Sequence, residues 1–226
     1  SFLSGNKIQE LPFAVTGAVC FENQAQFHPL EFIKALAQQL TIYENTNAIF
    51  VHGHQIATNH GMIEAENIIF ATHYPFLNVP GFYFLRQHQE RSYVVALEGQ
   101  EVPDKLSGIY YSVDQGGLSL RSASGKLLLG GGSHRTGKKV CYCERTGYSY
   151  LREQAKKYCP DAKETAYWAA QDCMPHDGIP FIGRYSIFTP HLYVATGFQK
   201  WGMTSSMVAA LLLRDEICGV RNPYSK

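Results

Sequence analysis

The stretch LYVATGFQKWGMTSSMVAALLLRDEICG, residues 192–219, decides the fold. Its first residues, LYVAT, predict a buried strand that Gly197 stops. An unbroken helical stretch follows from about Thr204 to Cys218, and Gly219 closes it as the residue after the C-cap. A strand, a glycine-bounded loop and a hydroxyl-rich first helical turn direct backbone N–H groups toward an anion. This stretch therefore predicts a ligand site where a strand leads into a helix.

A second strand end lies upstream, in the run IIFATHYP at residues 68–75. The apolar run predicts a strand that is buried on both faces and ends at Thr72 and His73. Open α/β sheets place ligands at the carboxyl ends of their strands. The Ala-Thr-His and Ala-Thr-Gly ends at 71–73 and 195–197 therefore predict a ligand cleft, but they do not name the ligand.

The middle of the chain, from Tyr83 to Val140, has the two-residue periodicity of strands, with glycine pairs between them. It predicts strands over Ser92–Leu97, Ile109–Val113, Leu118–Ser122 and Lys126–Gly130. A strand or hairpin over Leu11–Phe21 and a strand over Thr165–Ala170 extend the pattern, and a hairpin is expected over Ala48–Val51 and Gln55–Thr58. Helices are predicted from His28 to about Leu40 and over Tyr148–Tyr158. The expected fold class is α+β or α/β, with a mixed, largely antiparallel sheet of about five to eight strands beside a partial α/β domain.

Composition excludes several classes of protein. The 226 residues are 45% hydrophobic and 17% charged, so the chain is not a disordered one. A formal net charge of +1 gives no electrostatic case for binding nucleic acid or an anionic membrane. The apolar stretch at 207–213 is too short for a membrane span, which needs about 20 residues. Six cysteines without a C-x-x-C pair predict reduced thiols in a cytoplasmic protein and no metal site.

Four runs in order carry a family resemblance: ENQAQFHPLEFIKALAQQL at 22–40, IIFATHYP at 68–75, DGIPFIG at 177–183, and the stretch at 192–219. Together they resemble FAD-dependent oxidoreductases of the D-amino-acid oxidase superfamily, which includes glycine and sarcosine oxidases. The resemblance implies a non-covalent FAD and the oxidation of a small amine or amino acid by hydride transfer to the flavin. The alternative is a non-enzymatic binding module that keeps the fold without the flavin.

One element of that family is missing here, the strand–GxGxxG–helix fingerprint that holds the FAD pyrophosphate. The expectation is a fragment without that βαβ unit, in which FAD binding is weak or absent. The resemblance divides the chain into a partial FAD-binding domain with an N-terminal substrate-domain hairpin (1–73), a substrate-binding domain (74–164) and the C-terminal part of the FAD-binding domain (165–226). The end at 220–225 resembles the joint after which some members continue into a Rieske iron–sulfur domain, a possible partner in the same full-length chain.

The resemblance also suggests site residues, although it assigns no catalytic one. The cofactor-binding candidates are Ala48, Thr72, His73, Gly183, Gly197, Phe198, Gln199, Lys200, Trp201, Gly202, Met203 and Thr204. The substrate-binding candidates on the sheet are Tyr110, Tyr111, Arg121 and His134, and Arg is the usual partner of an amino-acid carboxylate. Lys200 either stabilises the negative charge of the reduced flavin or is an ordinary solvent-exposed lysine. Asp177 is expected to bond backbone N–H groups in its turn. Ala170 stands where flavin-linked members carry their attachment cysteine.

Overall fold

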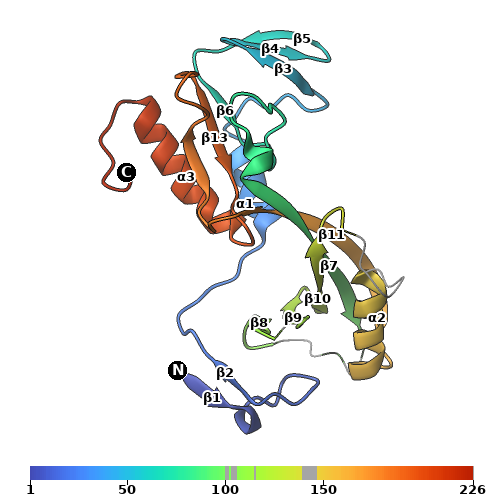
Figure 1. The fold of residues 1–226 in the computed structure, drawn as a ribbon. Coiled ribbons are helices and arrows are strands. Elements are labelled where there is room, and N and C mark those ends of the chain that lie inside the picture. The colour runs from blue at the N-terminus through green and yellow to red at the C-terminus, as the bar shows by residue number, and fades with distance from the viewer. Residues whose placement is uncertain (100–101, 103–105, 115, 139–146, 226) are drawn as a thin grey trace. The chain divides into compact units, whose positions relative to one another are not determined.

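The structure is a computed structural model that describes residues 1–99, 102, 106–114, 116–138 and 147–225. The chain forms two compact units (Figure 1). Unit 1 contains residues 1–25 and 90–171, and unit 2 contains residues 26–89 and 172–226. The chain passes from unit 2 to unit 1 within the long strand β7 (Gln87–Glu98). It returns to unit 2 within the long strand β11 (Lys163–Pro175).

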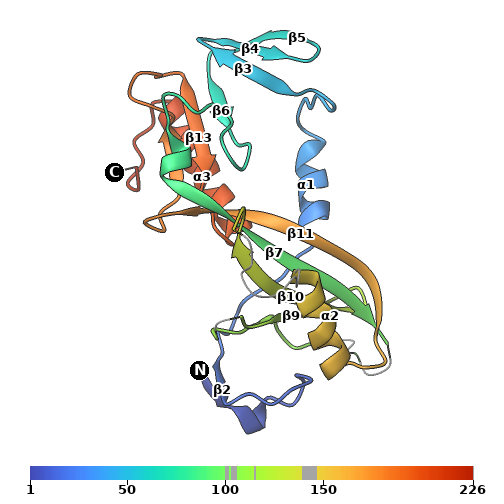
Figure 2. The ribbon, with the colours of Figure 1, turned by 45° about the vertical axis from the view of Figure 1, so that its right-hand side comes forward.

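Unit 1 is built on a five-stranded sheet with the strand order β11-β7-β10-β9-β8. Its other strands are β8 (Tyr110–Tyr111), β9 (Ser119–Ala123) and β10 (Lys126–Arg135). The pairs β7–β10, β10–β9 and β8–β9 are antiparallel, which confirms the largely antiparallel sheet expected from the two-residue periodicity. The helix α2 (Gly147–Tyr158) lies against this sheet (Figure 2).

The helix α2 covers one face of this sheet. Leu120, Leu127 and Leu129 point to the face that α2 covers, where they form one core with Leu151. Because side chains alternate along a strand, Arg121 and its cross-strand partner Leu128 point to the opposite face. A register shift between Gly131 and His134 interrupts the β7–β10 pairing.

The N-terminal segment corrects one expectation. The predicted strand or hairpin over Leu11–Phe21 forms only as β2 (Gly17–Val19), which pairs with β1 (Phe2–Ser4) in a separate two-stranded sheet. A short 3-10 helix, η1 (Gly5–Lys7), follows β1. Leu11 and Phe13 instead pack side chains against the unit 1 core, and the Phe13 ring lies 4.8 Å from that of Tyr158. Side-chain contacts, rather than strand pairing, therefore hold Leu11 and Phe13 in place.

Unit 2 contains two three-stranded sheets and two helices. The helix α1 (Pro29–Ala37) precedes the antiparallel sheet of β3 (Ala48–His52), β4 (Gln55–Thr58) and β5 (Gly61–Glu64). The second sheet has the order β12-β13-β6, formed by β6 (Ile68–Phe70), β12 (Phe181–Arg184) and β13 (Leu192–Thr196). β13 is parallel to β6 and antiparallel to β12. A 3-10 turn, η2 (Tyr83–Leu85), leads into β7.

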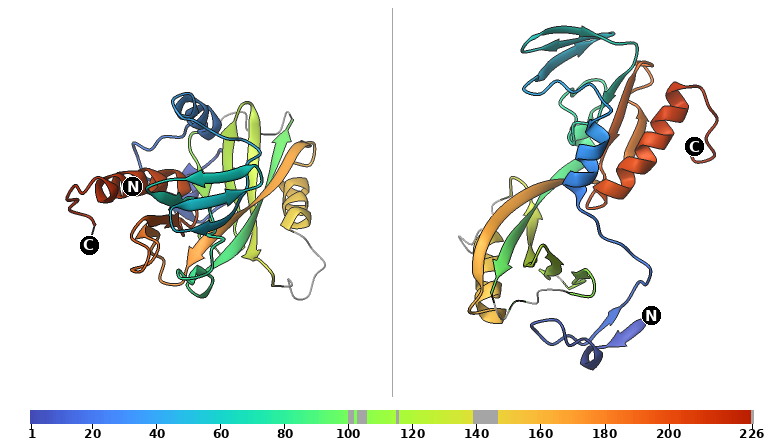
Figure 3. Two further views of the ribbon diagram at one scale, coloured as in Figure 1. Left: turned by 90° about the horizontal axis from the view of Figure 1, so that it is seen from above. Right: turned by 180° about the vertical axis from the view of Figure 1, so that it is seen from behind.

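The helix α3 (Gly202–Ile217) lies along this second sheet (Figure 3, right). All five residues of β13 are buried, as its apolar sequence predicts. Gly219 has φ +68°, and the N–H groups of Gly219 and Val220 bond Glu216 O (3.2 Å) and Asp215 O (2.7 Å). This is the predicted glycine-terminated helix end. Within the described part of the chain, no helix is long and apolar enough to cross a membrane.

The strand β6 differs from the expectation that it is buried on both faces. Ile68 and Phe70 are buried, but Ile69 is 45% exposed. Ile69 pairs with Tyr193 of β13 and so points to the face on which α3 packs. α3 contacts β12 and β13, and β6 is an edge strand among the described residues. Ile69 therefore lies beyond the cover of α3.

Candidate functional site

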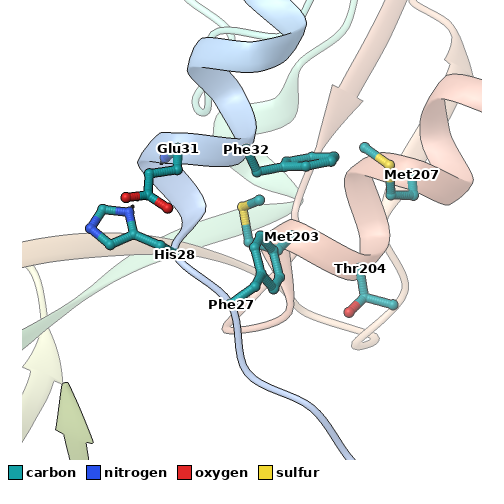
Figure 4. Close-up of a pocket in the computed structure, with 7 residues that line it drawn as sticks. All are labelled: Phe27, His28, Glu31, Phe32, Met203, Thr204 and Met207. Carbon is teal, nitrogen blue, oxygen red and sulfur yellow. Dashed lines mark hydrogen bonds between the residues drawn. The ribbon is translucent and has the colours of Figure 1, made fainter. Parts of the chain in front are cut away.

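The N-termini of α1 and α3 meet at an open pocket of about 590 Å³ (Figure 4). We call it the α1–α3 pocket. Both helices belong to unit 2. Its lining residues are Phe27, His28, Glu31 and Phe32 from the start of α1, and Met203, Thr204 and Met207 from the first turns of α3.

The start of α1 is fixed by its cap. Pro29 occupies the first helical position, where its missing N–H costs nothing. The His28 ring Nδ1 accepts a hydrogen bond from the N–H of Glu31 at 3.4 Å. Phe27 and Phe32 flank this cap, with ring centroids 5.6 Å apart in an edge-on arrangement. The α1 side of the pocket is therefore mainly aromatic.

The start of α3 is the polar end of the pocket. Trp201, the N-cap residue, makes no side-chain cap hydrogen bond, so its side chain satisfies none of the first-turn N–H groups. A Cβ atom built on Gly202 meets no atom within 4 Å. The positive end of the helix dipole favours a negative charge at this position. Met203 and Met207 add polarizable apolar side chains next to it.

The loop between β13 and α3 is held closely against the end of β11. Gly197 has φ +78°, and a Cβ atom there would lie 2.6 Å from Pro175 Cγ. Gln199, also at positive φ, donates its N–H to Cys173 O at 3.0 Å and its Nε2 to Gly178 O at 2.6 Å. The loop conformation therefore depends on glycine at 197 and on contacts with residues 173–178.

A buried polar junction lies beneath this loop. The Thr196 hydroxyl donates to His73 O at 2.5 Å and accepts from Gln87 Nε2 at 3.3 Å. The Cys173 thiol donates to the same His73 carbonyl at 3.3 Å, and burial raises the pKa of this thiol. The junction joins the ends of β6, β13 and β11 to the start of β7. His73 contributes through its carbonyl, while its side chain is exposed.

The structure gathers only some of the cofactor-binding candidates. Met203 and Thr204 line the α1–α3 pocket, and Gly197, Phe198, Gln199, Lys200, Trp201 and Gly202 form the loop that leads into it. Lys200 Nζ lies 2.7 Å from Asp172 Oδ2, so its charge is paired. Thr72 donates its hydroxyl to Tyr74 O at 3.1 Å in a turn after β6.

Two further cofactor-binding candidates lie elsewhere. Ala48 opens β3 and is exposed, and it does not line the pocket. Gly183 lines a second pocket beside the C-terminal half of α3, together with Arg184 and Glu216. As expected, Asp177 Oδ1 accepts the N–H of Ile179 at 3.0 Å within its turn.

The four substrate-binding candidates belong to unit 1, but they lie on two different faces of its sheet. Tyr111 pairs with Ser119, two residues before Arg121, so Tyr111 and Arg121 share the face that α2 leaves uncovered. Arg121 Nε is buried without a hydrogen-bond partner among the described residues. Tyr110 packs against the opposite core, and the His134 ring stacks on Tyr93 of that core at 5.7 Å.

Tyr110 has a local partner on its own face. Its hydroxyl donates to the Glu10 carboxylate, which also accepts the N–H of Ser107 at 2.7 Å. Burial raises the pKa of Glu10, but the hydrogen bonds from Ser107 and Tyr110 outweigh it and hold that pKa below its ordinary value. Burial together with the bond to Glu10 raises the pKa of Tyr110. Tyr110 thus anchors the N-terminal segment to the sheet.

Sequence reasoning did not select Phe27, Glu31 or Phe32, which line the α1 side of the pocket. The available signal was Phe27 and Phe32 on either side of the capped His28-Pro29 start. Met203 and Met207 are spaced by four residues and so share one helix face, which predicts a pair at the start of α3. The described residues include no group of three His, Cys, Asp or Glu side chains that is placed to hold a metal ion.

Comparisons with known proteins show the family of this chain. The family model described as "FAD dependent oxidoreductase" matches residues 1–216. A Bacillus subtilis (strain 168) protein named as a Rieske 2Fe-2S iron–sulfur protein is 37% identical over 233 residues, which cover 96% of this chain and 45% of that protein. The chain thus spans less than half the length of this curated relative.

Solved structures show the same fold at low identity. Glycine oxidase from Bacillus cereus matches with a TM-score of 0.75 and 19% identity, over 100% of this chain and 67% of that one. L-α-Glycerophosphate oxidase from Mycoplasma pneumoniae, with FAD bound, matches with a TM-score of 0.69 and 16% identity, over 99% of this chain and 66% of that one. The mixed α/β fold with largely antiparallel sheets resembles that of glycine oxidase.

Proposed function

Because this chain belongs to the family of FAD-dependent oxidoreductases, we propose that it is part of a flavoenzyme whose isoalloxazine ring sits in the α1–α3 pocket. The uncapped N-terminus of α3 carries this proposal. The residues present fit the ring: Phe and Met side chains match its flat apolar body, and the N–H groups of a helix start without a side-chain cap, with open space at Gly202, match its polar edge.

The residues of this chain have separate tasks in the proposed reaction. FAD, when bound, supplies the electron-accepting chemistry for a hydride removed from the carbon next to an amine. The first turn of α3 stabilises negative charge on the ligand, and the Thr196 junction fixes the loop that positions this turn. Phe27, Phe32, Met203 and Met207 exclude water from the apolar part of the pocket.

The substrate class is proposed from the open face of the unit 1 sheet. Arg121 is expected to bind the carboxylate of a small amino acid, because its buried Nε has no partner among the described residues and a guanidinium binds carboxylates in two places. Tyr111 shares that face and is expected to line the same subsite. In the complete enzyme, Arg121→Leu should raise KM for the amino acid more than tenfold, since losing a charged hydrogen bond costs about 1.5–3 kcal/mol.

We further propose that a dinucleotide-binding βαβ unit completes the enzyme and that FAD binds this chain alone only weakly. No GxGxxG turn occurs among its 226 residues to hold the pyrophosphate. The Rieske-named relative supports a Rieske domain as a further part of the full-length protein. A cytoplasmic location is also proposed, and the free thiols of Cys20, Cys173 and Cys218 support it.

Methyl NMR of the four methionines tests the position of the flavin, even where binding is weak. On titration with FAD, the Met203 and Met207 methyl resonances should shift, because they line the pocket. Met62, on the exposed strand β5, should not shift and serves as the internal control. The shifts should vanish in Gly202→Val and persist in Gly108→Val, since a Cβ at either glycine meets no protein atom. Equal shifts at Met62, or none at Met203 and Met207, would contradict the proposal.

A further inference from the structure

We propose that Asp172 is a positioning residue for the α1–α3 pocket: by pairing with Lys200, it keeps the positive charge of this lysine out of the pocket. A negative charge in the pocket is then stabilised by the N-terminus of α3 and not by Lys200. The consequence for a flavin rests on the proposed function, whereas the position of Lys200 is argued from the contacts of the loop.

The first observation is the place of the Lys200 charge. Lys200 stands two residues before Gly202, the first residue of α3, so its Cα lies at most about 7 Å from this helix start. A lysine carries its ammonium on a flexible four-carbon stem, so this charge could reach the pocket. Instead, Lys200 Nζ lies 2.7 Å from Asp172 Oδ2, and Lys200 is not among the residues that line the pocket.

The second observation is that the end of β11 holds the loop at two consecutive residues. The Cys173 carbonyl accepts the N–H of Gln199 at 3.0 Å, and the Asp172 carboxylate accepts the Lys200 ammonium. Gln199 has φ +51°, a left-handed conformation that costs a non-glycine residue free energy and persists where the surroundings hold it. Its Nε2 also donates to Gly178 O at 2.6 Å. The loop backbone and the ion pair therefore fix Lys200 together.

The third observation is the partial burial of the ion pair. The side chains of Asp172 and Lys200 are 22% and 35% exposed, so water and salt screen this pair less than a fully exposed one. Asp172 belongs to the long strand β11, which holds its carboxylate in place. The carboxylate is therefore the fixed partner and the lysine the movable one. Loss of the carboxylate would leave the ammonium without this counter-charge beside the pocket.

The size of the effect follows from Coulomb's law. At about 8 Å, a unit charge changes an equilibrium that creates one negative charge about two- to thirtyfold, for effective dielectric constants of about 80 to 20. Loss of Asp172 should favour negative charge in the pocket by this factor. For a flavin, the affinity for the reduced form relative to the oxidised form should rise equally, and a tenfold rise corresponds to about 30 mV for a two-electron couple.

Quenching of Trp201 fluorescence tests the position of Lys200 without a cofactor. Trp201 follows Lys200 in the chain and is 71% exposed. Because the chain has two tryptophans, a Trp168→Phe background leaves Trp201 alone. Iodide is an anionic quencher and acrylamide a neutral one, so quenching by iodide relative to acrylamide reports positive charge near the ring. This ratio should rise in Asp172→Asn, and it should not change in Asp161→Asn, which removes the same charge from an exposed site in unit 1.

A double-mutant cycle separates positioning from the simple loss of a charge. Fixed charges add, so Asp172→Asn would then raise iodide quenching equally with Lys200 present and in a Lys200→Gln background. If Asp172 positions Lys200, the rise should be at least about twofold larger with Lys200 present. Asp172→Glu keeps the carboxylate and should restore the parent value. Urea unfolding checks that each variant is folded.

Titration with FAD tests the consequence for the pocket. The methyl resonances of Met203 and Met207 give the affinities of the chain for oxidised FAD and for FAD reduced with dithionite. The reduced-to-oxidised affinity ratio should rise about two- to thirtyfold in Asp172→Asn. It should return to within about twofold of the parent ratio in Asp172→Asn/Lys200→Gln, because both members of the pair are then neutral.

Each result has a defined reading. An equal rise of iodide quenching with and without Lys200, or no rise at all, overturns the inference even where FAD shifts Met203 and Met207. An unchanged affinity ratio in Asp172→Asn also overturns it, because the released charge then does not reach the pocket. A larger rise with Lys200 present, without any FAD-dependent shift at either methionine, upholds the positioning role of Asp172 and contradicts the proposed flavin site.

Discussion

Gly197→Ala is expected to destabilise unit 2 by about 2–5 kcal/mol. Gly197 has φ +78°, and an L-residue in the left-handed region costs about 1–2 kcal/mol. The added Cβ would also lie 2.6 Å from Pro175 Cγ and 3.3 Å from Gln87 Oε1. The proline ring cannot rotate away, and overpacking of this kind costs about 1–3 kcal/mol. The two costs together give the expected loss.

Gly202→Ala is the matched control, because a Cβ at Gly202 meets nothing within 4 Å and its φ is not in the left-handed region. Its free energy of unfolding should stay within about 0.5 kcal/mol of the parent or rise slightly through helix propensity. Urea unfolding followed by far-UV circular dichroism measures both variants. A loss below about 0.5 kcal/mol in Gly197→Ala, or an equal loss in Gly202→Ala, would refute the account of the loop.

Three further predictions test the cores and the C-terminal segment. Leu151→Ala should destabilise unit 1 by about 2–5 kcal/mol, and Leu151→Met by less than about 1.5, because Leu151 is fully buried; urea unfolding measures both. Thr196→Val should cost about 1–3 kcal/mol in unit 2, because Gln87 Nε2 loses its acceptor and His73 O loses one of the two donors described above, whereas Thr196→Ser should restore stability. Hydrogen bonds from Arg214, and then from Asn222, hold the pKa of Asp215 below its ordinary value. The stabilisation from Asp215 is therefore complete above the ordinary pKa of about 3.9 and is lost as pH falls through the lowered pKa. Asn222→Ala should reduce this acid dependence of the urea midpoint.

The periodicity of apolar residues predicted most helices and strands, because in these elements the apolar face of the sequence is also the face that packs on a core. The helix after Gly202, the buried strand β13 and the strands of the unit 1 sheet all follow from two-residue or 3.6-residue repeats. The repeat alone failed where tertiary contacts decide. Leu11 and Phe13 use their side chains to pack on a core from a loop, and Ile69 is exposed because β6 is an edge strand among the described residues.

Side chains that are neighbours in a strand point to opposite faces of its sheet. Tyr110 and Tyr111 are neighbours in the chain, yet one packs in the α2-covered core and the other points to the open face with Arg121. A one-residue shift of register would exchange them, and no sequence pattern in this short strand fixes that register. The role of Phe27 and Phe32 in the pocket was missed because the pocket depends on two helix starts separated by more than 160 residues.

The free energy that the N-terminus of α3 can contribute is small. The proposed pocket is therefore expected to stabilise charge on the flavin rather than to bind FAD tightly. A helix N-terminus is worth about 0.3–2 kcal/mol to a nearby charge, which is at most about thirtyfold in an equilibrium. Nanomolar binding requires about 12 kcal/mol. The pocket is open to solvent, and Lys200 already pairs with Asp172, so neither supplies the remainder. Under the proposed function, most of the binding free energy would therefore come from contacts to the dinucleotide outside this pocket, and the turn at Gly202 is proposed to set how strongly negative charge on the ring is stabilised.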